Sequence, residues 1–202
     1  FGEDFRFIRS DTQEDTADVI CRIYLNLVKQ YGIERVQILS PYRTEGACST
    51  DQLNLVIREM VNPPRENEFD LKVGSNYFRV GDKVMQIKNY EQVNNGDVGY
   101  IQTITGDEND ATVVIDFGDG RIMEYENDQL KMLDLGYAST IHKSQGAQYK
   151  SVIMNLQCAH AIMLIRAIVY TAITRARLRL MIVGERKALC RAIRNTKADQ
   201  RG

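Results

Sequence analysis

Residues 5–40 decide the fold, and they read FRFIRSDTQEDTADVICRIYLNLVKQYGIERVQILS. Residues 5–9 alternate in character as a half-buried β-strand does, and residues 36–40 form a short run typical of a buried strand. Between these segments, residues 13–31 repeat apolar side chains at the spacing of one helix face. The repeating positions are Val19, Ile20, Ile23, Tyr24, Leu27 and Val28. The stretch therefore predicts a strand, a helix and a second strand.

The same alternation continues to residue 64. A second helix is predicted from Ser49 or Thr50 to Met60, and the Asn-Pro-Pro run at 62–64 ends it because proline cannot continue a helix. The order strand, helix, strand, helix favours an α/β fold, in which helices cover the faces of a parallel sheet.

The character of the chain changes between residues 72 and 133. Turn signals rich in Gly, Asn and Asp at 95–97 and 118–120 separate short apolar segments. Strands are predicted at 83–87, 98–104, 112–117 and 122–125. Short strands at this spacing predict a small antiparallel β-barrel.

After this segment the β-α alternation returns. The pattern predicts a strand at 151–156, a helix at 163–172, a strand at 178–184 and a basic terminal helix. The simplest organisation is one α/β domain, made of residues 1–71 and 134–202, that is interrupted by a barrel at 72–133.

Composition is that of a globular protein. The chain has 202 residues, of which 44% are hydrophobic and 26% charged, and no apolar run approaches the roughly 20 residues that span a bilayer. Its four cysteines are scattered, without metal spacing, so we expect a reducing cytoplasm, no metal site and no membrane partner. The first residue is Phe1 rather than methionine, which suggests a fragment.

Charge is unevenly distributed. From Gly136 onward, the sequence contains twelve Lys and Arg residues but only two acidic ones, Glu185 and Asp199. This third therefore carries a net charge of about +10 and the rest of the chain about −11. Such a basic block is a plausible footprint for nucleotide or nucleic acid. From Arg186 onward, we favour solvated helix-surface residues instead.

Two strings carry chemistry. TIHKSQG at 140–146 and VYTAITRA at 169–176, taken together, resemble motifs V and VI of superfamily 1 DNA helicases. VQILSPYR at 36–43 resembles motif IV, while RVGDKVMQ at 79–86 and NGDVG at 95–99 resemble turns of bacterial RecD-like helicases, relatives of the exodeoxyribonuclease V alpha chain.

This resemblance implies the C-terminal part of a RecD-like helicase: a second RecA-like domain with an inserted SH3-like barrel. The chain contains no G-x-x-x-x-G-K-[ST] loop to cradle nucleotide phosphates. The family pattern places that loop, and the residues that bind ATP and Mg²⁺, in a first RecA-like domain before Phe1. ATP and Mg²⁺ are therefore cofactors expected of the parent protein, with none expected in this chain alone.

The resemblance also implies a nucleotide site. Arg175 is the candidate arginine finger, since arginine stays charged and offers a planar fork of donors to phosphate oxygens. Arg43 is expected to reach the same phosphate. Gly146 is expected to pass close to the nucleotide, with Gln148 near the ribose. Relatives usually carry Gly-Ser-Glu where this chain has Gly-Ala-Gln, so Gln148 brings no charge to that position.

Five residues are DNA-binding candidates. Thr140, His142 and Lys143 are expected at a strand-to-helix junction, where main-chain N–H groups and hydroxyls bind phosphates without reading sequence. Ser40 and Asn95 complete the set, and Asn95 equally suits a turn position selected for its backbone conformation.

The expected function is that of the second motor domain of an ATP-dependent DNA helicase that moves 5′ to 3′. Its expected partners are single-stranded DNA, duplex junctions and the N-terminal RecA-like domain, and the chain alone should not hydrolyse ATP. The alternative is a non-enzymatic nucleic-acid-binding adaptor, which explains the barrel and the basic charge but not the Thr-Arg-Ala motif at 174–176.

Overall fold

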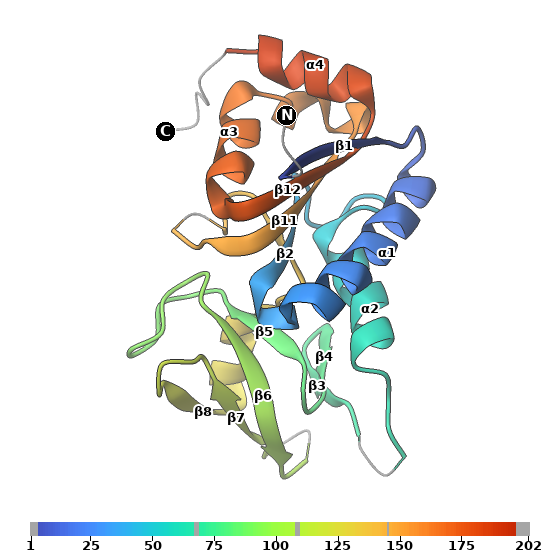
Figure 1. The fold of residues 1–202 in the computed structure, drawn as a ribbon. Coiled ribbons are helices and arrows are strands. Elements are labelled where there is room, and N and C mark those ends of the chain that lie inside the picture. Colours follow the sequence, from blue (N-terminus) through green and yellow to red (C-terminus); the bar gives the residue numbers. More distant parts are fainter. Residues whose placement is uncertain (1–3, 67–68, 108–109, 145, 197–202) are drawn as a thin grey trace. The chain divides into compact units, whose positions relative to one another are not determined.

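A computed structural model describes residues 4–66, 69–107, 110–144 and 146–196 (Figure 1). The chain divides into two compact units: Phe1–Leu53 together with Ala138–Gly202, and Asn54–Tyr137. These are called unit 1 and unit 2. The predicted insert at 72–133 lies within the bounds of unit 2, and helix α2 (Thr50–Val61) crosses the sequence boundary between the units.

Unit 1 contains the predicted parallel sheet. Its strand order is β1-β12-β11-β2-β10, and every neighbouring pair is parallel. The strands are β1 (Phe5–Arg9), β2 (Val36–Ser40), β10 (Ala138–Thr140), β11 (Tyr149–Leu156) and β12 (Ala176–Gly184). Because all strands run the same way, their last residues share one edge, called here the carboxyl edge. Their first residues share the opposite, amino edge.

Helices connect these strands or, in the case of α4, follow the last of them. They are α1 (Gln13–Tyr31), α3 (Arg166–Arg175) and α4 (Arg186–Arg194), with short 3₁₀ segments η1 (Ile33–Arg35) and η3 (Cys158–Met163). The start of α1 is capped by Thr12, whose side-chain oxygen accepts a 3.1 Å hydrogen bond from the Asp15 N–H. Its end is Gly32, which has a φ of +91° that other residues rarely adopt.

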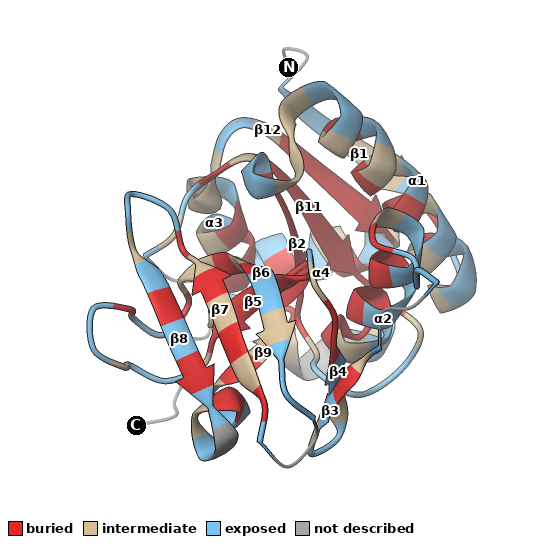
Figure 2. Ribbon diagram, turned by 90° about the horizontal axis from the view of Figure 1, so that it is seen from below, coloured by how far each residue is buried: buried red, intermediate tan, exposed pale blue. Residues whose placement is uncertain are grey.

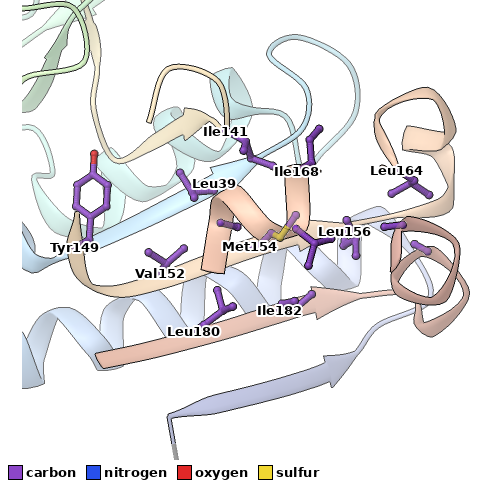
Figure 3. Packing of buried hydrophobic residues seen from close by; sticks show 14 residues of the cluster. Leu39, Ile141, Tyr149, Val152, Met154, Leu156, Leu164, Ile168, Leu180 and Ile182 are labelled. Atoms are coloured by element: carbon purple, nitrogen blue, oxygen red, sulfur yellow. The ribbon is translucent and has the colours of Figure 1, made fainter. Parts of the chain in front are cut away.

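The core of unit 1 lies between the sheet and its helices (Figure 3). Buried side chains of the two central strands, such as Leu39, Val152 and Met154, pack in one cluster with Ile168 of α3. Since β2 and β11 are buried at every position or nearly so, they read as apolar runs rather than alternating ones. This packing fixes the strand ends that carry the candidate site.

Unit 2 is built on an antiparallel sheet of order β8-β7-β6-β5-β9. Figure 2 shows the alternation that one covered face requires: buried residues alternate with exposed ones along β8 and with half-buried ones along β7. The elements are β5 (Lys83–Gln86), β6 (Val98–Thr105), β7 (Thr112–Asp116), β8 (Ile122–Glu126), η2 (Asn127–Met132) and β9 (Leu133–Leu135), preceded by the hairpin β3 (Leu71–Val73) and β4 (Asn76–Phe78).

A buried carboxylate organises unit 2. Asp82 is fully buried and accepts hydrogen bonds from Arg58 Nε at 2.9 Å, Asn62 Nδ2 at 2.8 Å, the Arg79 N–H at 2.8 Å and Tyr137 Oη at 3.1 Å. Burial raises the pKa of Asp82, while these donors favour its ionised form. The four donors come from residues far apart in sequence, so Asp82 joins both ends of unit 2.

Arg79 forms the second ion pair of this cluster. It is nearly buried and holds Asp70 through Nε at 2.7 Å and Nη2 at 2.8 Å. The two-pronged contact lowers the pKa of the Asp70 carboxyl. Neighbouring Arg58 also approaches Asp70, at 3.1 Å.

The predicted fold class is confirmed for the parallel sheet, and β1, β2, β11 and β12 begin and end within two residues of their expected bounds. The predicted helix at 163–172 begins later, at Arg166, because residues 158–163 form η3 instead. Strands β3, β4, β9 and β10 were not predicted. Each has three residues, too few to show a hydrophobic period. No helix in the described part of the chain is long and apolar enough to cross a membrane.

Candidate functional site

The carboxyl edge brings two candidate residues together. Strands β2 and β10 are neighbours, and their register pairs Ser40 with Thr140, the last residue of each. Open parallel sheets bind ligands outside the carboxyl ends of their strands. Ser40 itself is fully buried: its hydroxyl donates to the Cys48 carbonyl at 2.7 Å and accepts from Asn155 Nδ2 at 3.3 Å. Ser40 therefore fastens the loop that follows β2.

Thr140 begins a tight turn. Its side-chain oxygen accepts from the Lys143 N–H at 3.4 Å, and its carbonyl accepts from the Ser144 N–H at 3.2 Å. The Ser144 hydroxyl donates a hydrogen bond to the Ile141 carbonyl at 2.7 Å. The prediction of a strand-to-helix junction here is wrong. Residues 141–144 form a turn instead, and the next element is strand β11, which begins at Tyr149. The turn leaves His142 exposed and Lys143 half-buried.

The connection from this turn to β11 crosses to the amino edge of the sheet, because β10 and β11 run the same way. Gly146 lies in it with a φ of +92°, a left-handed value that glycine adopts without strain. A side chain there would meet nothing within 4 Å. Gln148 is exposed, and its Oε1 accepts from Arg177 Nε at 3.0 Å. Gln145 lies outside the described residues.

Arg175 occupies the amino edge. It is the last residue of α3, directly before β12, whose first residue Ala176 is in register with Tyr149 of β11. Its Nη1 donates to the Ala147 carbonyl at 2.9 Å and lies 3.5 Å from the Ser144 carbonyl. These contacts hold the arginine against the 144–148 connection.

Among the described residues, no carboxylate neutralises the charge of Arg175. Its hydrogen-bond acceptors are two main-chain carbonyls and the Thr174 hydroxyl, at 3.3 Å from Nη2. The Nε atom is buried and has no hydrogen-bond partner among the described residues. Buried polar groups are ordinarily satisfied, so the guanidinium keeps a hydrogen-bond donor that these contacts do not use.

The structure does not bring Arg43 to Arg175. Arg43 follows β2 at the carboxyl edge, is exposed, and approaches Asp51 with Nε at 3.6 Å from Oδ1. Arg175 is at the amino edge, and the register places Leu39 of β2 opposite Met154, five residues into β11. At about 3.3 Å per residue, the two edges are roughly 17 Å apart along the strands.

Asn95 belongs to unit 2. Its main-chain N–H donates to Asn89 Oδ1 at 2.8 Å, and the following Gly96 has a φ of +96° and donates to the Gln86 carbonyl at 2.8 Å. These bonds define the turn between β5 and β6 and leave the Asn95 side chain exposed.

Ser144 and Arg177 were not singled out from sequence, yet they support the candidate residues directly. The Ser144 carbonyl faces Arg175, and Arg177 holds Gln148. Ser144 lies inside the TIHKSQG string and Arg177 directly follows the VYTAITRA string, and these positions are the only sequence signal for them. No group of three or more His, Cys, Asp or Glu residues in the described segments is arranged to hold a metal ion.

Comparison with known families identifies two segments. Residues 53–117 match the model of the ATP-dependent RecD-like DNA helicase SH3 domain, and residues 135–183 match that of the UvrD-like helicase C-terminal domain. The second match includes Thr140, Gly146 and Arg175.

Curated relatives agree with these matches. The chain is 36% identical over 169 residues to the ATP-dependent RecD2 DNA helicase of Deinococcus radiodurans, covering 83% of this chain and 22% of that protein. It is 29% identical over 177 residues to an uncharacterized protein of Methanocaldococcus jannaschii, covering 75% of this chain and 15% of that protein. The chain thus spans about a fifth of the length of the relatives it matches.

The fold has a counterpart among solved structures. The Pif1 helicase from Bacteroides, solved in complex with ADP-AlF3 and ssDNA, superposes with a TM-score of 0.51 over 95% of this chain and 52% of that chain. The two sequences are 18% identical, so this likeness concerns the fold alone.

Proposed function

The chain belongs with the RecD-like DNA helicases, and we propose that it forms the second RecA-like motor domain of an ATP-dependent DNA helicase that moves 5′ to 3′ on single-stranded DNA. The family matches support this assignment, because they join the SH3 domain of RecD-like helicases to a helicase C-terminal domain in one chain. The sheet of unit 1 supplies two edges, one for each ligand of such a motor.

The amino edge is the proposed nucleotide side. Phosphoryl transfer depends on positive charge placed where the phosphoryl oxygens gain negative charge. Arg175 suits that role, because its guanidinium has no carboxylate partner, and its Nε no acceptor, in the part of the chain that the structure describes. Gly146 and Gln148 lie in the same connection as Ala147 and are proposed to line the nucleotide. ATP and Mg²⁺ would be held mainly by a P-loop domain outside these residues.

The carboxyl edge is the proposed DNA side. The turn that starts at Thr140 exposes His142, and Lys143 follows it. Hydroxyls, main-chain N–H groups and cations of this kind hold phosphates without reading the bases, as a translocating motor requires. Arg43 also lies at this edge, so its position favours a phosphate of DNA over the nucleotide.

One connection links both sides. The Thr140 carbonyl binds the Ser144 N–H, and the Ser144 carbonyl faces Arg175 across 3.5 Å. A shift of the turn on DNA binding would therefore move an acceptor of Arg175. This arrangement supports coupling between DNA contact and the nucleotide side.

The observation that carries the proposal is the uncompensated guanidinium of Arg175 within the matched helicase domain. In the longer protein, Arg175→Ala should abolish ATP hydrolysis and leave single-stranded DNA binding intact. A protein that acts only as a nucleic-acid-binding adaptor would not hydrolyse ATP in the first place, so Arg175→Ala could not abolish hydrolysis while leaving DNA binding intact.

A further inference from the structure

Helix α4 presents a row of exposed cations. Arg186, Lys187, Arg191 and Arg194 are all exposed, and at 3.6 residues per turn their positions fall on one face, together with Cys190. The opposite face carries Ala188 and Ala192, both fully buried in the core of unit 1. We call the four cations the α4 basic face.

Neighbouring carboxylates do not neutralise this face. Among the described residues, none of the four cations forms an ion pair or side-chain hydrogen bond with an acid. Asp11 is engaged by Arg9, at 2.9 Å, and Glu185 Oε1 accepts the Cys158 N–H at 2.8 Å. Asp11 is thus paired with Arg9, and the four cations outnumber the remaining carboxylate of Glu185, so the α4 basic face carries a net positive charge.

The surface beside α4 is hollowed. A depression of about 460 Å³ is lined by residues of α4, by Glu185, by Arg9 at the end of β1 and by Asp11 just after it. Three of the four cations of the α4 basic face line it. The remaining one, Arg191, lines an adjoining depression that shares Lys187, Cys190 and Arg194. A charged groove of this kind raises the local concentration of an anionic ligand.

The groove lies on the same edge of the sheet as the proposed DNA side. β1 ends at Arg9 and β12 at Gly184, just before α4 (Figure 1). The strand register places both ends at the carboxyl edge, together with Ser40 of β2 and Thr140 of β10. Four strand intervals of about 4.8 Å separate β10 from β1, so the edge is roughly 19 Å long. That length matches on the order of six stacked nucleotides at 3.4 Å each.

We propose that the α4 basic face binds the phosphate backbone of single-stranded nucleic acid and extends the strand's path along the carboxyl edge, from the Thr140 turn to the far side of the sheet. This inference rests on the proposed function. Charge complementarity identifies the occupant: the face offers four cations, and Ile193 is the one exposed large apolar side chain on α4, whereas protein partners bury several aromatic or apolar anchors at an interface centre.

The test is equilibrium binding of a fluorescent 12-nucleotide oligo-dT to the 202-residue chain at several salt concentrations. The double variant Lys187→Gln, Arg191→Gln should weaken binding on the order of tenfold at 0.1 M salt, and it should reduce the slope of log K against log salt by about 1.4, since each lost phosphate contact on a single strand contributes about 0.7. The matched control is Arg22→Gln, Lys29→Gln on the exposed face of α1, which removes the same charge.

Cys190 gives a second readout that needs no variant. It is exposed within the α4 basic face, whereas Cys21 and Cys48 are buried. Bound oligonucleotide should slow alkylation of Cys190 severalfold, as followed by mass spectrometry of the peptide that contains it. Poly-glutamate of equal charge should not protect it.

The outcomes separate the two proposals. Undiminished binding by the α4 variant, with Cys190 unprotected, would overturn the α4 inference and leave the proposed function standing. Protection of Cys190 by poly-glutamate but not by oligo-dT would assign the face to an acidic protein instead. Failure of the unmodified chain to bind oligo-dT would contradict both proposals.

Discussion

The Arg175 guanidinium donates a 2.9 Å hydrogen bond from Nη1 to the main-chain carbonyl of Ala147. Arg175 belongs to the VYTAITRA string, and Ala147 directly follows the TIHKSQG string, 28 positions earlier. This bond places a cation at the amino edge of the sheet and ties it to the connection that begins at the opposite edge. Arg175 is therefore a phosphate-binding candidate whose position depends on the conformation of that connection.

The chain by itself should not hydrolyse ATP. It contains no P-loop string, so nothing in it would cradle the α- and β-phosphates. The measurement is phosphate release by the purified 202-residue chain with saturating ATP, Mg²⁺ and single-stranded DNA. Turnover that copurifies with the chain through successive columns would show this expectation to be wrong.

Lys143 should contribute one phosphate contact to DNA binding. The substitution Lys143→Gln should weaken oligo-dT binding severalfold and lower the salt slope by about 0.7. Titrations at 50 to 200 mM salt measure both quantities. Lys131→Gln, an exposed cation of unit 2 paired with Asp128, serves as the control. Equal slopes for the two variants would remove Lys143 from the DNA side.

Asp82 should be essential to the stability of unit 2. The substitution Asp82→Ala removes the buried carboxylate that Arg58 Nε contacts at 2.9 Å, and it removes the acceptor of one hydrogen bond each from Asn62 and Tyr137. Breaking one partner of a buried ion pair costs about 3–5 kcal/mol of unfolding free energy. Urea denaturation monitors the loss. Asp128→Ala, which removes an exposed pair with Lys131, should give an unchanged midpoint.

Acid should weaken unit 2 through Asp70. The pKa of this carboxyl is lowered by Arg79, so the folded state holds fewer protons there than the unfolded state does. The stabilisation is present above the unfolded value near 3.9 and is lost as the pH falls through the lower folded value. Burial raises the pKa of Asp82, which acts in the opposite direction.

The Asp70→Asn variant isolates this effect. Its unfolding free energy should be lower than that of the unmodified chain at pH 6, and the difference should shrink as the pH falls below about 4. Urea unfolding of the two proteins at pH 6, 4 and 3 measures the difference. A gap that stayed constant across this range would mean that the Asp70–Arg79 pair is not the acid-sensitive contact.

Long, periodic segments could be predicted from sequence. The apolar stripe of α1 and the buried runs of β2 and β11 carry the signal themselves, so the parallel sheet followed from them. Three-residue strands such as β10 carry no such signal, because sheet neighbours distant in sequence define them.

The candidate functional site could be predicted from sequence only in part. Motif strings pointed to Arg175 and Thr140, but the separation of Arg43 from Arg175 depends on strand register, which no local pattern reveals. Likewise, the burial of Ser40 follows from its contacts with Cys48 and Asn155. The charge of α4 was visible in the sequence, but its position at the carboxyl edge was not.

The most direct test of the motor-domain assignment is DNA-stimulated ATP hydrolysis by the longer protein that contains this chain. We predict that Arg175→Ala lowers the rate by about 10³-fold or more, that Arg175→Lys fails to restore it, and that Arg22→Ala, an exposed arginine on α1, has no effect. Single-stranded DNA affinity should stay within twofold in all three. Hydrolysis at the unmodified rate in Arg175→Ala would contradict the account.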